Sequence, residues 1–280
     1  MKRGGLAISA QGFTIVETLI VLAVTGILFV SAALMINGKQ SRTDFQVGVR
    51  NLQQRLQQII NQTASGYYPN NGDFRCTVTG LIGSPLRISS VDPTGQGQNQ
   101  DCIFAGTAVV FGGPGSADKY GVYPLAGQRT YGGVDVTTPT QARLTAVAQG
   151  TTTNTDAPRV DRVVLPNGLT YVGSNIQHGV FAVAFLSTFG KFQGPSSDSM
   201  GGSQQLKLST YHLPWDLASD VENINNEAIN GGLFQYPTPS TSVDLCFDSG
   251  GTKQSVIISI DVGLNVTTSI KTGVTGVNCP

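Results

Sequence analysis

A single carboxylate, Glu17, lies near the start of a long apolar run that extends from Phe13 to Ile36. The other polar side chains of the run are all Thr or Ser, which can bond back to carbonyls of their own helix. As a helix the run would be about 36 Å long, enough to cross a hydrocarbon core of roughly 30 Å. Because a charge inside such a helix is costly, Glu17 is expected to have a specific role.

The composition describes a folded chain with many strands and turns. Only 12% of the 280 residues are charged, while Gly (35 residues) and Pro (13 residues) are abundant, which favours an extracytoplasmic β-rich domain. Lys and Arg together number 17 and are matched by 17 acidic residues. Nucleic-acid binding is therefore not indicated, although a basic surface built by folding or assembly is left open.

The residues before the apolar run set the expected orientation. Residues 1–12 carry Lys2 and Arg3 and no acid, so this short end is expected to stay cytoplasmic and the bulk of the chain to be exported. One alternative is a secretory signal peptide with Val30-Ser31-Ala32 as the cleavage site. A plain signal anchor that keeps its membrane helix is another alternative.

The sequence Gly12-Phe13-Thr14-Ile15-Val16-Glu17, followed at once by the apolar run, resembles the class III signal of type IV pilin-like proteins. The resemblance implies that residues 1–12 are a leader, removed between Gly12 and Phe13 by a prepilin peptidase. The same enzyme would methylate the new amine of Phe13. It also implies a mature chain that begins at Phe13 and places Glu17 in its first helical turns.

The resemblance and elementary electrostatics agree on a role for Glu17. In a packed bundle of such helices the carboxylate would be shut away from water, at a cost of several kcal/mol unless a cation pairs with it. In the family this cation is the amine of a neighbouring subunit, here Phe13, and the pairing sets subunit register. The alternative is a charge that merely reaches the membrane surface.

A second helical pattern follows the apolar run. Between residues 39 and 65 a stripe recurs at spacings of three and four, while charged and amide side chains lie off it. The stripe comprises Phe45, Val49, Leu52, Leu56, Ile59 and Thr63. We therefore predict one helix over residues 13–65, with a membrane or filament-core part (13–36) and an amphipathic part (37–65). The stripe is expected to pack on the protein's own sheet, a free coiled coil being the alternative, and Gly66 is expected to end the helix.

Residues 66–280 read as an exported β-rich head, which makes the predicted fold α+β with a mostly antiparallel sheet. Short apolar or alternating runs predict strands at 102–111, 134–136, 160–165, 169–172, 180–186, 205–211, 242–247, 255–261 and 264–270. Turn residues predict hairpins at Pro166-Asn167-Gly168 and at Val262-Gly263. One further helix is predicted over Asp216 to Ile229.

All four cysteines follow the membrane segment and lie on the predicted exported side. An even number in an exported domain favours two disulfides. Neighbourhood in the sequence favours pairing Cys76 with Cys102 and Cys246 with Cys279, although three connectivities exist. A zinc site is the rival interpretation, but the chain has no Cys-x-x-Cys pair and only two histidines.

Motifs of common catalytic sites are missing from the sequence. It contains no Gly-x-Ser-x-Gly, no His-Glu-x-x-His and no phosphate-binding loop that ends in Gly-Lys-Ser/Thr. His178 and His212 are isolated histidines. We therefore expect no enzymatic activity, cofactor or metal, and the alternative is a signal-anchored extracytoplasmic enzyme or binding protein.

The resemblance implies a structural subunit of a type IV pilus or pilus-like filament that serves motility, adhesion or DNA uptake. A pseudopilin of type II secretion is an alternative within the same class. Expected partners are other pilin subunits, the prepilin peptidase and N-methyltransferase, the pilus assembly platform and the membrane. The protein is expected to be a single-pass membrane protein before assembly and afterwards part of a surface filament or the cell envelope.

Overall fold

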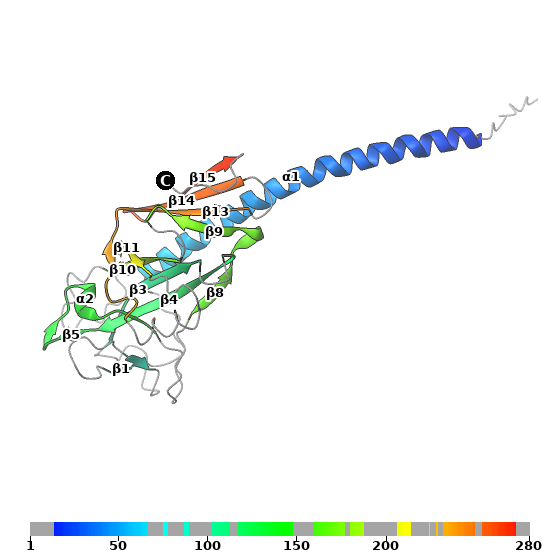
Figure 1. Cartoon of the computed structure of the whole chain (residues 1–280). Helices are drawn as coiled ribbons and strands as arrows, with labels where there is room; N and C mark the ends of the chain where they lie inside the picture. Colours follow the sequence, from blue (N-terminus) through cyan, green and yellow to red (C-terminus); the bar gives the residue numbers. More distant parts are fainter. Residues whose placement is uncertain are drawn as a thin grey trace, which may run out of the picture. The chain divides into compact units, whose positions relative to one another are not determined.

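A computed structural model describes residues 14–66, 75–77, 87–89, 102–112, 117–147, 160–176, 180–187, 206–213, 224, 228, 232–249 and 254–272. The chain divides into two compact units, Met1–Asp44 and Phe45–Pro280, which are described separately below. An N-terminal apolar helix and a mostly antiparallel sheet region make this an α+β protein (Figure 1).

The long helix α1 covers Ile15–Ala64 without interruption. Its residues up to Asp44 belong to the first unit, and those from Phe45 onward belong to the second. The helix ends as predicted, because Gly66 adopts the left-handed conformation with φ 67° and its N–H bonds to the carbonyl of Thr63. All six residues of the predicted stripe are buried, while Arg42 and Arg50 are exposed.

The larger sheet of the second unit has seven strands in the order β12-β11-β10-β3-β4-β7, and β8 also pairs with β4. Every pairing in it is antiparallel. Its strands are β3 (Cys102–Phe111), β4 (Lys119–Gln128), β7 (Thr145–Ala146), β8 (Asp161–Val164), β10 (Phe181–Ser187), β11 (Leu206–His212) and β12 (Thr238–Pro239). The strands at its centre, β10 and β3, are buried on both faces.

The smaller main sheet has four antiparallel strands in the order β15-β14-β13-β9. These are β9 (Thr170–Ser174), β13 (Ser242–Asp248), β14 (Gln254–Asp261) and β15 (Val266–Thr272). Figure 1 shows β13, β14 and β15 side by side. Val256, Ile258 and Ile260 of β14 are fully buried and Ile257 is nearly so, which means that this strand is buried on one face and partly on the other.

Six short elements remain in the described part of the chain. β1 (Arg75–Thr77) pairs with β2 (Arg87–Ser89), and β5 (Thr130–Tyr131) pairs with β6 (Val134–Asp135). The helix α2 covers Pro139–Ala142, and a single helical turn, η1, covers Pro166–Gly168.

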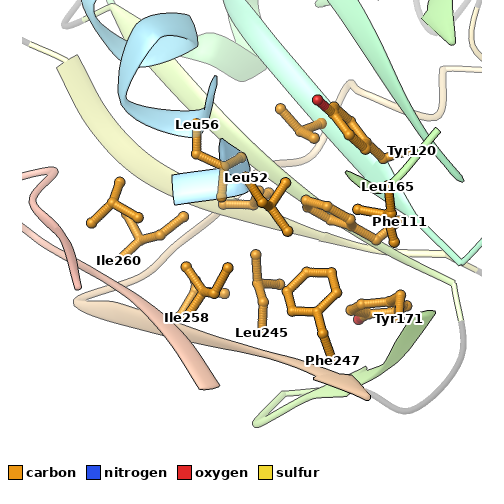
Figure 2. Close-up of a cluster of buried hydrophobic side chains, with 14 of the residues drawn as sticks. Leu52, Leu56, Phe111, Tyr120, Leu165, Tyr171, Leu245, Phe247, Ile258 and Ile260 are labelled. Atoms are coloured by element: carbon orange, nitrogen blue, oxygen red, sulfur yellow. The ribbon is translucent and has the colours of Figure 1, made fainter. Parts of the chain in front are cut away.

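One hydrophobic cluster joins the end of α1 to both main sheets. In Figure 2, Leu52 and Leu56 of α1 lie beside Leu245, Ile258 and Ile260 of the four-stranded sheet. Phe111 lies between the sheets, with its ring centroid 5.4 Å from that of Tyr171 and 5.7 Å from that of Phe247.

Two polar contacts hold the helix in the same place. Gln53 Nε2 donates to the Val266 carbonyl at 2.7 Å, and the hydroxyls of Thr63 and Thr107 are 2.9 Å apart. The predicted stripe is thus part of the core of the second unit.

A second cluster lies on the other face of the seven-stranded sheet. It contains Ile103, Val110, Ala182, Tyr211 and Phe234 among its buried members. Tyr211 stacks edge-on against Phe234, with centroids 5.2 Å apart. The two clusters explain why β3 and β10 are buried on both faces although they belong to an antiparallel sheet.

One of the two predicted hairpins is wrong. The strands on either side of Pro166-Asn167-Gly168 lie in different sheets, because β8 pairs with β4 and β9 pairs with β13. The turn residues behave as expected locally, since Asn167 and Gly168 both have positive φ, but the chain crosses between sheets there. The other hairpin is confirmed by the pairing of β14 with β15 around Val262-Gly263. The helix predicted over Asp216 to Ile229 lies almost wholly outside the described residues.

Candidate functional site

The start of α1 holds Glu17 in a capping box. Thr14 precedes the first helical residue, and both its backbone N–H (3.0 Å) and its hydroxyl (2.9 Å) donate to Glu17 Oε2. In return the Glu17 N–H donates to Thr14 Oγ1 at 3.3 Å. This reciprocal bonding satisfies N–H groups that a helix start would otherwise leave unpaired.

The capping box leaves the carboxylate accessible. Glu17 is exposed, and among the described residues no group donates a hydrogen bond to Oε1. The carboxylate also lies in the first turn, where the helix dipole favours negative charge. Glu17 is therefore held in one place by its own chain and still open to a cation from outside.

The first part of the helix has an apolar, exposed surface. The stretch Ile15–Ala32 is long and apolar enough to span a membrane, and none of it is buried within the protein. Its remaining polar side chains bond to the helix itself, as predicted: Thr18, Thr25 and Ser31 each donate to a carbonyl three or four residues earlier, at 2.8 Å. Glu17 is thus the only ionisable side chain of this stretch.

Sequence reasoning found Glu17 and missed Thr14. The signal was present, because Thr14-Ile15-Val16-Glu17 has the Thr-x-x-Glu spacing of a capping box before an apolar run. Gly12 and Phe13, the predicted cleavage site, lie outside the described residues. Their roles in cleavage and methylation remain predictions.

The cysteines are distributed over the second unit. Cys246 in β13 is fully buried and disulfide-bonded. Cys76 lies in β1 opposite Ile88, and Cys102 begins β3. Cys279 lies outside the described residues, so the connectivity remains a prediction.

No second chemical site emerges from the described residues. Among them, no group of three or more His, Cys, Asp or Glu side chains could hold a metal ion. His212 is an exposed residue at the end of β11, and His178 lies outside the described part of the chain. Burial raises the pKa of Tyr123 to about 12, which keeps this phenol neutral in the second cluster.

The fold and the helix start define a class: an α+β protein whose N-terminal helix is able to span a membrane and carries one capped carboxylate. Comparison of the chain with protein-family models, with curated proteins and with solved structures found no match.

Proposed function

We propose that this protein is a structural subunit of a type IV pilus or pilus-like filament, processed after Gly12 and assembled through α1. The observation that carries the proposal is the capped carboxylate of Glu17 at the start of the apolar stretch Ile15–Ala32, none of which is buried within the protein. A membrane anchor alone has no need of a carboxylate there. A helix that must also pack against copies of itself can use one to fix their register.

The capping box fits this use. Cleavage after Gly12 would leave Thr14 as the second residue, so both partners of the box stay in the mature chain. Oε2 is held by Thr14, and Oε1 would meet the amine of Phe13 in a neighbouring subunit. Inside a bundle this ion pair would satisfy two charges that are costly to bury apart.

We infer that α1 as a whole connects the membrane to the head. Its last turns are fixed to the sheets by the Gln53 and Thr63 hydrogen bonds and by the stripe residues. A pull on the helix would therefore act on the core of the head. The expected orientation keeps residues 1–12 in the cytoplasm and exports the head.

The test replaces Glu17. Glu17→Ala and the nearly isosteric Glu17→Gln should both leave the protein in the membrane and prevent its entry into filaments, while Glu17→Asp retains part of the entry. The measurement is the amount of tagged variant in sheared filaments relative to the membrane fraction. If Glu17→Gln entered filaments like the wild type, charge pairing would be excluded.

A pseudopilin of type II secretion would use the same helix start. Electron microscopy of cells that lack the gene separates the two: loss or alteration of surface fibres supports a pilin, whereas normal fibres with a loss of secretion support a pseudopilin. A signal-anchored enzyme or binding protein would change neither.

A further inference from the structure

The sheet edges of the second unit differ in how far they are protected against pairing with another chain. An edge strand presents unpaired N–H and C=O groups, and proteins usually blunt it with short strands, proline or a covering segment. β12 has only two residues and includes Pro239, and β7 also has two. β9 is covered in part, because the Tyr171 N–H donates to the Ala117 carbonyl at 2.7 Å.

Strand β15 has little of this protection. It runs for seven residues with no proline and no irregularity in its pairing with β14. The side chains of residues 267–271 are all exposed, and within the described part of the chain no strand pairs with the second edge of β15. Lys271 is its only charge.

The hydrogen-bond pattern shows which groups of β15 face outward. The Asp261 N–H donates to the Asn265 carbonyl, so residues 267, 269 and 271 bond to β14 by the alternation of an antiparallel ladder. Residues 266, 268 and 270 therefore turn their N–H and C=O groups away from β14. The carbonyl of Val266 already accepts from Gln53, which leaves Thr268 and Ile270 as the open edge.

Strand β8 is a second edge, which is four residues long and contains no proline. Within the described residues it pairs with β4 alone, and the Leu165 N–H donates to the Asp118 carbonyl at 2.7 Å. By the same alternation, Arg162 and Val164 direct their backbone groups outward. Val164 is 60% exposed and Ile270 of β15 is 38% exposed, so each edge also leaves an apolar side chain in solvent.

We propose that β15 of one subunit pairs with β8 of a second copy of this chain, so that their sheets become continuous. An antiparallel register must place outward residues opposite outward residues, and Ile270 opposite Arg162 with Thr268 opposite Val164 does so. This register also puts Lys271 directly opposite Asp161, an opposite-charge pair. Hydrogen bonding and charge thus select the same register.

The pairing joins two different surfaces and so leaves a free β15 and a free β8 at the ends. Such heterologous contacts build open chains unless the rotation closes them into a ring. The pairing deepens the proposed filament function, and its biological use rests on that function. Its chemistry involves neither Glu17 nor the membrane segment.

Cysteine cross-linking of full-length protein in membranes tests the register. One tagged copy carries Val164→Cys and a second, differently tagged copy carries Thr268→Cys; facing residues of a hydrogen-bonded pair lie about 5.5 Å apart at Cα, within disulfide range. We expect an oxidised heterodimer from the mixture and none when Val262→Cys, another exposed position, replaces Thr268→Cys. A cross-link from Thr268→Cys protein alone would mean self-pairing of β15 and would overturn the proposal.

A charge exchange made in the same two cysteine-carrying copies tests the register in a second way. Lys271→Glu should lower the heterodimer yield about fivefold, because the pair with Asp161 becomes a like-charge pair, and Asp161→Lys on the other copy should restore it. Equal yields in all four combinations would contradict the register. If the two cysteine variants assemble into filaments but do not cross-link there, strand pairing alone is refuted. If they cross-link but the protein never enters filaments, the filament function alone is refuted.

Discussion

The hydroxyl of Thr14 donates a hydrogen bond to Glu17 Oε2 at 2.9 Å and accepts one from the Glu17 N–H at 3.3 Å. Glu17 therefore has a hydrogen-bond partner within its own chain. The capping box gives the carboxylate a role in starting the helix, which is separate from the proposed role in meeting a cation. Variants of Thr14 and of Glu17 should accordingly differ in their effects.

Thr14→Ala should loosen the first turn of α1 without removing the charge. Loss of an N-cap side chain is expected to speed exchange of the first-turn amide hydrogens about fivefold. Thr14→Ser keeps the hydroxyl and should exchange like the wild type. Hydrogen exchange of the full chain in detergent micelles, followed by mass spectrometry, measures this; equal protection in all three proteins would show that the capping box does not hold the helix start.

Gly106→Ala should destabilise the second unit strongly. Gly106 has φ 146°, and a Cβ there would overlap the Phe185 carbonyl oxygen in the neighbouring strand. We expect a loss of about 3 kcal/mol or more in the free energy of unfolding, measured by urea denaturation. Gly132→Ala is the matched control, since Gly132 also has a positive φ of 60° but has open space around it, and should lose only about 1 kcal/mol.

Thr63→Val tests how much the buried contact between α1 and β3 contributes to the free energy of unfolding. The Thr63 hydroxyl bonds to Thr107 and to the Ile59 carbonyl, and both threonines are buried. Removing one hydroxyl leaves the other without this partner, so each single Val variant should lose about 1–2 kcal/mol in the free energy of unfolding. The Thr63→Val/Thr107→Val double variant should lose less than the sum of the two. Strict additivity would mean that the hydroxyls do not interact.

The turn between β14 and β15 should make stability depend on pH in the acid range. The Asn265 backbone N–H and then its side-chain amide bond to Asp261, and they hold the pKa of Asp261 below its ordinary value. The folded state thus binds this proton less tightly than the unfolded state, so the stabilisation is present above the ordinary pKa and is lost as pH falls through the folded one. Asn265→Ala should therefore destabilise at neutral pH and have little effect at about pH 2. An equal destabilisation by Asn265→Ala at both pH values would exclude Asp261 as the cause of the pH dependence.

The sequence predicts well where a pattern reports burial directly. The stripe from Phe45 to Thr63 gives the packed face of α1, and alternation in β14 gives its buried face. Strand β4 was not predicted although it is ten residues long, because it contains Pro124 and two glycines. The proline is tolerated since it falls between the stretch that pairs with β8, up to Val122, and the stretch that pairs with β7, from Leu125.

Which strand or group a segment pairs with is harder to predict from the sequence than its local conformation. Pro166-Asn167-Gly168 makes a turn as its residues demand, but nothing in those residues tells whether the next strand returns to the same sheet. The same limit applies at the helix start. The Thr-x-x-Glu spacing indicates the bonds within one chain, whereas the proposed partner of Oε1 would come from a second chain.

The most direct test of the filament account is the N-terminus of the mature protein. Intact-mass and N-terminal peptide analysis of protein recovered from the cell envelope should find a chain that begins with N-methylated Phe13 and retains Pro280. A chain that begins at Met1 would identify an uncleaved anchor, and one that begins at Ala33 would identify a secretory signal peptide. Either result would contradict the account, because the amine that Glu17 is proposed to meet would not exist.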